Sequence, residues 1–439
     1  MKALTWAIRL TIFLFLFAFA AAFGQIDWNA TDTLKATLGL RYTHDEKTLR
    51  EELRLLCYGG GPAWDFSSIG FTQFCGPGAG RSLYTDGQNL NAYDVSGIAT
   101  AATGVTSNVY PGVLAPAALD MSTGFYIRNS ADSWNAVSGS LSLNWQPNEN
   151  TLLYGRYDRG YKAGAFTNAL TIVAFPEADK ETVDAYEVGA KLRPLERLTT
   201  NLSVFFYDWS NRQTPVTFPA ATAPYNCTSN CSIFINIPKS QSKGAELETM
   251  WTPFTDAHVR FNYSYLQATV DKGGPFVDAS LPGSAPVSVI GADLPNSPRN
   301  KYSVGGDYTF RPDIGPINVS AIYSWRDKQW SEIFNTKWRE TPAYGTLNLN
   351  ASWTDQSGRF TIFAFGNNIT NEETYQYIAN QGTTFRNPAQ NGIPGFASQL
   401  PGGPQISTYV PAGAGSSFQS STYNANPLRT LGIELRAKF

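Results

Sequence analysis

Charged residues are scarce in this chain of 439 residues. They make up 15% of the sequence, against about 25% in ordinary soluble proteins. With a formal net charge of −2, the chain has no excess of positive charge that would attract nucleic acid. It has only two histidines and no G-x-S-x-G segment, so it lacks the pattern of a hydrolytic triad. We therefore expect no enzymatic activity and no nucleic-acid partner.

The two histidines are the only side chains that could supply an imidazole ligand to haem or iron. We place His44 at the end of a strand, before the longest loop, and His258 on a strand face that lines a lumen. Both are interpreted as ordinary side chains, although imidazole is a common iron ligand and a haem-receptor role is the alternative. The Gly-rich segment 76–82 lacks the G-K-[ST] ending of a phosphate-binding loop. The sequence therefore predicts no cofactor and no metal site.

Long apolar runs are absent except at the start of the chain. Lys2 and Arg9 flank an apolar segment that runs from Leu10 to Ala22 and is rich in alanine at its end. A charged start, an apolar core and small residues at the exit are typical of a secretory signal peptide, predicted here over 1–22. Alternatives are a membrane anchor, although the run is short for the about 20 residues of a span, or an upstream apolar stretch read from an accidental start codon. Residues 23–439 are predicted to form one domain.

Cysteines number only four, and they fall in two loops. An exported protein meets an oxidising compartment, which favours disulfides. The simplest of the three possible pairings joins neighbours in sequence, Cys57 with Cys75 and Cys227 with Cys231. A metal site is the alternative, but the C-x3-C spacing at 227–231 has neither the usual C-x2-C pattern nor a nearby histidine.

Aromatic residues, by contrast, are abundant at 14%, with 11 Trp and 22 Tyr. The last segment, Pro427–Phe439, alternates strictly. Its apolar residues Leu431, Ile433 and Leu435 point one way, and its charged residues Glu434, Arg436 and Lys438 point the other. A strand between lipid and a water-filled lumen has this pattern, and outer-membrane barrels add aromatic girdles. A secreted all-β protein is the alternative that composition leaves open.

Strand-like segments with the same two faces recur along the chain. The connections between them alternate strictly between tight turns and long loops. The tight turns are predicted at 29–32, 146–150, 194–197, 253–256, 311–315 and 355–358, and the long loops at 45–134, 163–180, 212–235, 272–297, 331–343 and 374–426. Up-and-down outer-membrane barrels have short turns at one end and long loops at the other. We predict an all-β, transmembrane, antiparallel up-and-down barrel with about thirteen strands, a number that departs by one from the even counts of bacterial barrels.

The predicted lumen face carries a set of charged residues. They are Arg156, Asp158, Lys162, Glu187, Lys191, Arg193, Glu246, Glu248, Arg260, Asp307 and Arg326. One hypothesis makes them a ligand path or contacts to a plug. The other makes them a solvated wall whose opposite charges pair across strands. Loop aromatics (Tyr110, Trp134, Trp330, Trp338 and Tyr344) either stack on a ligand or belong to the outer girdle.

Several segments resemble the C-terminal barrel portion of TonB-dependent outer-membrane receptors. They are FGQIDWNATDTLKATLGLRYTHD (23–45), YGRYDRGYKAGAF (154–166), ETVDAYEVGAKL (181–192), KGAELE (243–248), NSPRNKYS (296–303), FGNNITNEETY (365–375) and the ending TLGIELRAKF. The resemblance implies a barrel of about 22 strands, of which this chain holds about thirteen. It also implies a location in the bacterial outer membrane, contact with outer-membrane lipid, and assembly by the barrel assembly machinery, with Phe439 as part of the assembly signal.

The same resemblance implies uptake of a scarce ligand, most simply a ferric siderophore or a similar iron complex, energised by the TonB complex. The chain departs from the family pattern because no plug domain or TonB-contacting box lies between the predicted signal and the first strand. TonB is therefore expected as a partner only if a plug is supplied. The alternative function is a passive, porin-like or vestigial barrel fragment without active transport.

Overall fold

The computed structural model describes residues 15–16, 19–53, 56–59, 81–85, 91–94, 118–120, 125–166, 177–218, 231–278, 285–385 and 416–438. Almost all of them form β-strands, and the only helix in these ranges is the short 3-10 helix η2 (Lys337–Arg339). None of the described helical segments is long and apolar enough to cross a membrane.

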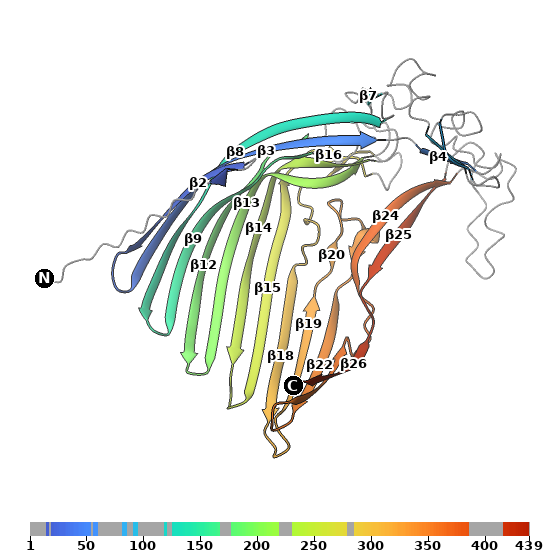
Figure 1. The fold of residues 1–439 in the computed structure, drawn as a ribbon. Coiled ribbons are helices and arrows are strands. Elements are labelled where there is room, and N and C mark those ends of the chain that lie inside the picture. Colours follow the sequence, from blue (N-terminus) through green and yellow to red (C-terminus); the bar gives the residue numbers. More distant parts are fainter. Residues whose placement is uncertain are drawn as a thin grey trace.

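Thirteen long strands form one antiparallel sheet, in which each strand pairs with its neighbours in sequence order (Figure 1). They are β2 (Phe19–Asn29), β3 (Leu34–Leu53), β8 (Phe125–Asn148), β9 (Thr151–Lys162), β12 (Glu181–Leu195), β13 (Leu198–Phe218), β14 (Cys231–Trp251), β15 (Ala257–Lys272), β18 (Asn300–Phe310), β19 (Ile317–Arg326), β22 (Tyr344–Thr354), β23 (Phe360–Asn367) and β26 (Thr430–Ala437). The short strands β1 (Phe15–Leu16) and β7 (Ala118–Asp120) pair with β2 and β8. The predicted all-β class, up-and-down order and strand number are confirmed.

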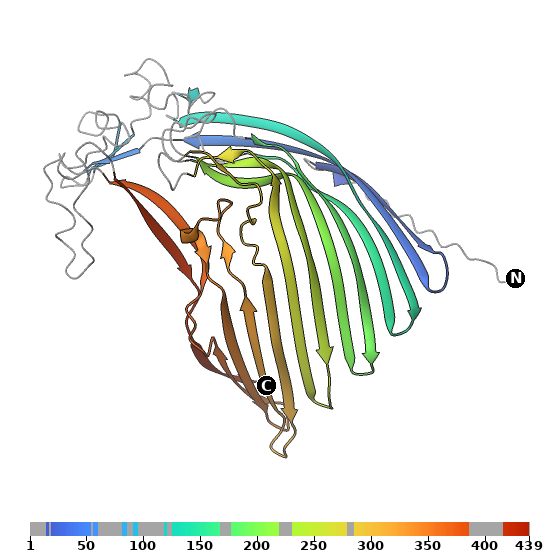
Figure 2. The same cartoon turned by 180° about the vertical axis from the view of Figure 1, so that it is seen from behind.

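All six tight turns lie at one end of the sheet and the long connections at the other (Figures 1 and 2). Turn chemistry explains the tight end: Asp355, for example, accepts hydrogen bonds from the backbone N–H groups of Ser357 and Phe360. The long connections carry small antiparallel sheets. They pair β4 (Leu56–Gly59) and β5 (Arg81–Thr85) with β6 (Asn91–Asp94), β10 (Ala165–Phe166) with β11 (Glu177–Ala178), β16 (Pro275–Phe276) with β17 (Val287–Ser288), β20 (Gln329–Trp330) with β21 (Glu340–Thr341), and β24 (Tyr375–Phe385) with β25 (Ser416–Ala425).

The two faces of the sheet differ as the alternation predicts. On the apolar face, Leu431, Ile433 and Leu435 are 67%, 75% and 75% exposed, and no second layer covers them. Val188 and Val204, paired across β12 and β13, are exposed on the same face. The opposite, polar face carries Ser, Asn, Thr and charged residues in every cross-strand row from β2 to β22. The convex face of the described sheet is therefore apolar, and no protein layer covers it.

Several strands continue beyond the length predicted from the sequence. Segments 45–53, 125–134 and 212–218 belong to β3, β8 and β13, where the sequence predicted loops. Those loop predictions were wrong. The extensions of β3 and β8 pair with each other along their whole length, and a small apolar core stabilises the loop end at β13. The core contains Val216, Phe218, Ile233, Ile235, Ile237, Ala268, Val270, Val289, Leu294 and Ile333, which come from three long strands and from later loops.

Above this core, a buried ion cluster joins two of the loops. Arg339 Nη1 lies 3.2 Å from Asp278 Oδ1, with side chains only 6% and 1% exposed, and it also contacts the carboxylate of Glu332. Glu340, next in sequence, accepts hydrogen bonds from Lys328 and Lys337. Burial raises the pKa of the Glu340 carboxyl, but these two hydrogen bonds outweigh burial and the net pKa is lowered. The cluster thus fixes η2 and β21 against the segment that follows β15.

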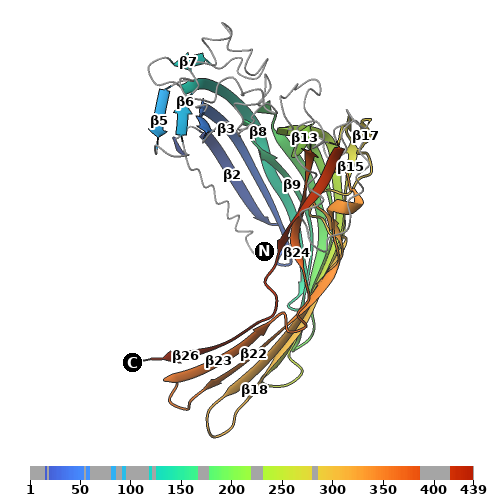
Figure 3. The same ribbon diagram turned by 90° about the vertical axis from the view of Figure 1, so that its right-hand side faces the viewer.

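The sheet curves strongly but does not close (Figure 3). Its edges are β2, extended by β1, and β26, which do not pair with each other in the described part of the chain. Strand β2 begins at Phe19, inside the range 1–22 predicted as a signal peptide. The removal of that range stays a prediction, as does the role of Phe439, which lies outside the described residues.

Gly244 in β14 is a point where the sheet requires the absence of a side chain. A Cβ atom added there would collide with the backbone oxygen of Tyr265 and with the Phe205 ring. We expect Gly244→Ala to destabilise the sheet by about 1–3 kcal/mol, as overpacking does. The urea midpoint of protein refolded in detergent micelles measures this effect. Gly24→Ala is the control, since nothing lies within 4 Å of that Cβ position, and an equal loss in both variants would contradict the explanation.

Candidate functional site on the polar face

Ten charged residues were predicted to line the lumen and to contact a ligand or a plug, and they come from six strands. Cross-strand register places all of them on the polar face: Arg156, Asp158, Lys162, Glu187, Lys191, Glu246, Glu248, Arg260, Asp307 and Arg326. They do not form one site. The structure divides most of them into three groups, and their contact with a ligand or a plug stays a prediction.

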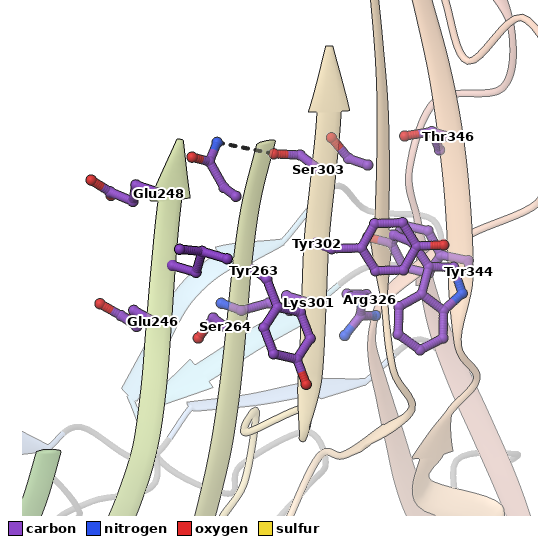
Figure 4. A pocket seen from close by; sticks show the side chains of 14 residues that line it. Glu246, Glu248, Tyr263, Ser264, Lys301, Tyr302, Ser303, Arg326, Tyr344 and Thr346 are labelled. Atoms are coloured by element: carbon purple, nitrogen blue, oxygen red, sulfur yellow. Dashed lines mark hydrogen bonds between the residues drawn. The ribbon is translucent and has the colours of Figure 1, made fainter. Parts of the chain in front are cut away.

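The first group lines a shallow cavity of about 430 Å³ that crosses five strands (Figure 4). One cross-strand row contributes Glu246, Ser264, Lys301, Arg326 and Tyr344. The next row contributes Glu248, Asn262, Ser303, Ser324 and Thr346. Acidic side chains therefore lie on β14, and basic side chains lie on β18 and β19.

Arg326 is held in place within this cavity. Its guanidinium carbon lies 4.5 Å from the centroid of the Tyr344 ring, a cation–π geometry. Its Nη2 donates a hydrogen bond to the Tyr375 carbonyl oxygen at 3.0 Å. Its buried Nε has no hydrogen-bond partner among the described residues. A buried donor of this kind normally has an acceptor, so the Nε–H of Arg326 is an unsatisfied donor within the cavity wall.

The remaining polar groups of the cavity differ in their availability. Asn262 Nδ2 donates to Ser303 Oγ at 3.2 Å, so these two groups already satisfy each other. Glu246, Glu248 and Lys301 are exposed. The cavity therefore combines two basic groups, two carboxylates and an aromatic ring within one continuous wall.

The second group lies beside a cavity of about 640 Å³ between β2 and β12. Arg156 Nε is 2.5 Å from Asp158 Oδ2, and Tyr154 donates to Glu187 at 2.5 Å. These polar groups satisfy one another, although the ion pair lies along β9 and only the Tyr154–Glu187 hydrogen bond crosses to β12. Lys162 and Lys191 lie on the same face but line neither cavity.

The third group surrounds Asp307, nearer the tight turns. His258 Nδ1 lies 2.8 Å from Asp307 Oδ2, and Arg260 Nη1 lies 3.1 Å from Asp307 Oδ1. His44 is not at a strand end as predicted: it lies within β3, with Nδ1 2.8 Å from Asn135 Oδ1. Within the described residues, no group of three or more His, Cys, Asp or Glu side chains is placed to hold a metal ion.

The loop aromatics have different environments. Tyr344 opens β22 and lines the first cavity. Trp134 lies within β8, only 5% exposed and packed against Phe166, so the predictions of ligand stacking and of a girdle position were both wrong for it. Trp330 lies 5.2 Å from the Lys328 ammonium. Tyr110 and the Trp338 side chain lie outside the described residues, as do Cys75 and Cys227, so the disulfide pairings stay predictions.

Sequence reasoning missed Lys301, which stands between Ser264 and Arg326 in the first cavity. The predicted strand began one residue later, at Tyr302. The signal was nevertheless available, because Lys301 shares its alternation with Ser303 and Asp307. Extending the strand by one residue would have included it.

Comparison with known proteins identifies the fold. A family model described as TonB dependent receptor-like, beta-barrel matches residues 16–369. A search of curated protein sequences found no match. Similar solved structures include the ferric yersiniabactin uptake receptor FyuA from Yersinia pestis, with 14% identity, a TM-score of 0.59, and coverage of 96% of this chain and 45% of that one.

Two further structures share the fold. The siderophore receptor PiuA from Acinetobacter baumannii has 14% identity and a TM-score of 0.52, over 81% of this chain and 39% of that one. The copper transporter OprC has 12% identity and a TM-score of 0.50, over 82% of this chain and 43% of that one. This chain thus spans less than half the length of these three structures. Since the family model matches well over half of the chain, the protein belongs to the TonB-dependent receptor-like β-barrel family.

Proposed function

We propose that this chain forms part of the barrel wall of a bacterial outer-membrane receptor. The receptor would take up a ferric siderophore or a similar iron complex, with energy from TonB. Family membership supports a receptor rather than an enzyme. FyuA is a ferric yersiniabactin uptake receptor and PiuA is a siderophore receptor. The single observation that carries the proposal is the first cavity, where Arg326 and Lys301 stand beside Tyr344 on the polar face.

The basic side of this cavity suits an anionic iron complex. There Lys301 and Arg326 attract negative charge, and Tyr344 offers a ring face beside the guanidinium. Glu246 and Glu248 stand on the opposite side of the cavity, on β14. In the proposed function, TonB would act through a plug domain. The barrel assembly machinery and outer-membrane lipid are the further partners of the proposal.

Binding of iron complexes tests the cavity directly. We expect the double variant Lys301→Gln/Arg326→Gln to bind its best ligand at least tenfold more weakly, since a hydrogen bond to a charged group contributes about 1.5–3 kcal/mol. The assay is equilibrium binding of a panel of radioactive ferric complexes, namely catecholate, hydroxamate and mixed-ligand siderophores and ferric citrate, to refolded chain in detergent. Lys35→Gln, on the polar face but far from the cavity, is the control. Equal affinities of the double variant and the wild type would contradict the assignment of the cavity.

A passive role, as a porin-like or vestigial barrel fragment, is the alternative to active uptake. Under this alternative the chain would conduct ions without gating, or would carry no transport. Conductance across planar bilayers separates the two functions: large steady currents support the passive pore. Ligand uptake by cells that depends on both the chain and TonB supports the receptor.

A further inference from the structure

Two acidic residues, Glu246 and Glu248, form one side of the first cavity. They stand two residues apart on the polar face of β14, so their exposed side chains lie next to each other on that face. Their cross-strand neighbours are uncharged, namely Ser203 and Ser264 beside Glu246, and Asn201 and Asn262 beside Glu248. Glu248 Oε2 accepts a hydrogen bond from Asn201 Nδ2 at 3.4 Å. Two carboxylates of like charge are therefore adjacent, with neutral side chains on both neighbouring strands.

The basic groups nearest to these carboxylates do not pair with them. Lys301 shares a row with Glu246 but lies two strands away, on β18. Lys191 shares a row with Glu248 and is likewise two strands away, on β12. Arg260, which is diagonal to Glu248 on β15, pairs with an aspartate of β18. Within the described residues, neither Glu246 nor Glu248 forms an ion pair with any of these groups.

The cavity is therefore acidic on one side and basic on the other (Figure 4). Glu246 and Glu248 lie on β14, whereas Lys301 and Arg326 lie on β18 and β19, with the Tyr344 ring beside the guanidinium. Because adjacent strands are about 4.8 Å apart, roughly 10 Å separates β14 from β18 and roughly 14 Å separates it from β19. The two sides are thus spaced to meet opposite charges at the two ends of one bound molecule.

We propose that the iron complex bound by this chain carries a protonated amine in addition to its negatively charged iron-binding part. The inference rests on the proposed function and specifies the class of ligand for the same cavity. Glu246 and Glu248 hold the ammonium group between them, since an ammonium has three hydrogen-bond donors, enough for both carboxylates. Lys301 and Arg326 hold the anionic part, about 10–14 Å away.

The same two carboxylates also determine which complexes are rejected. A wholly anionic complex that fills the cavity must place negative charge beside Glu246 and Glu248, and like charges brought together disfavour binding. A cationic group on the ligand instead relieves the repulsion between the two carboxylates. Selectivity therefore arises both from attraction of the amine and from repulsion of complexes that lack one.

A matched pair of ligands tests the proposal. One is a synthetic ferric tris-catecholate that carries a primary amine on a flexible arm, and the other is the same complex with the amine acetylated. We expect the wild-type chain, refolded in detergent, to bind the amine form at least tenfold more tightly, because a hydrogen bond to a charged group is strong enough to supply that factor. In the variant Glu246→Gln/Glu248→Gln, affinity for the amine form should fall to that for the acetylated form.

Glu434→Gln is the matched control, since Glu434 pairs with Arg436 on β26 and does not line the cavity. It should keep the preference of the wild type for the amine. Undiminished binding of the acetylated form by the double glutamine variant shows that this variant is folded.

Two results would overturn the proposal. They are equal affinity of the wild type for the two forms, and a preference for the amine form that persists in the double glutamine variant. If the wild type binds ferric complexes without preferring the amine, the ligand class is wrong and the proposed function stands. If the wild type binds no ferric complex at all, the proposed function is wrong and this inference falls with it.

Discussion

Replacing Arg339 with leucine is expected to destabilise the loop end of the sheet by about 3–5 kcal/mol, the usual loss when one partner of a buried ion pair is removed. Arg339 and Asp278 are 6% and 1% exposed and lie 3.2 Å apart. The leucine variant leaves the Asp278 carboxylate buried without its cation. Because the cluster joins η2 to the segment after β15, we expect local opening of these loops rather than loss of the whole sheet.

Limited proteolysis of the refolded protein, at increasing urea concentration, measures this local opening. Lys337→Leu is a matched control, since Lys337 lies in the same helix but its side chain is 81% exposed. Its partner Glu340 keeps a second cation, Lys328, so no unpaired buried charge results and the expected loss is small. Replacing both Asp278 and Arg339 with leucine should recover part of the loss, because the fully buried carboxylate is then gone, while Glu332, at 27% exposure, still loses its cation. Comparable sensitivity of Arg339→Leu and Lys337→Leu would show that burial of the cluster is unimportant.

Placing arginine at Val204 is expected to cost about 2–4 kcal/mol, the range measured for a lipid-facing cation near the middle of a membrane barrel. Val204 is 51% exposed on the apolar face, between Leu202 and Phe206 on the same strand. If that face lies in hydrocarbon, the guanidinium must either lose its hydration or distort the strand to reach the interface. A protein whose exposed face met water would tolerate the same change.

The neighbouring residue supplies the control. Ser203 occupies the polar face opposite Glu246, so Ser203→Arg should change stability by less than about 1 kcal/mol. The stability of both variants is compared by urea-dependent folding into phospholipid vesicles. The comparison is repeated in aqueous buffer without lipid or detergent. A cost at Val204 no larger than that at Ser203 would refute the assignment of the apolar face to lipid, and with it the fold-based proposal of membrane insertion.

The alternation that assigned faces in the sequence held because it is a local property of extended backbone. A residue such as Val204 or Glu246 needs only its own strand to decide its face. Tight turns were equally predictable, since Asp355 and similar residues stabilise a turn with their own side chains. Family segments such as 181–192 and 243–248 added the barrel topology. The same local rule would have included Lys301 if the strand had been started one residue earlier.

Contacts between distant segments were not predictable in this way. Trp134 was assigned to a loop, yet it is buried in β8 against Phe166, which follows a different strand. Arg339 and Asp278 are separated by a long stretch of sequence, and neither shows a pattern that names its partner. Polar loop composition around 212–235 also concealed the extension of β13 and β14, because the core that stabilises it includes Leu294 and Ile333 from later loops.

By itself, the sequence determined a two-faced antiparallel strand array with tight turns at one end, because side-chain alternation and turn formation depend on neighbours along the chain. Only the tertiary structure decided which charges meet. Register across five strands places Glu246, Lys301, Arg326 and Tyr344 in one wall, and it brings His258 and Arg260 of β15 to Asp307 of β18. These outcomes follow from the pairing of strands that long loops separate, and no local pattern specifies that register.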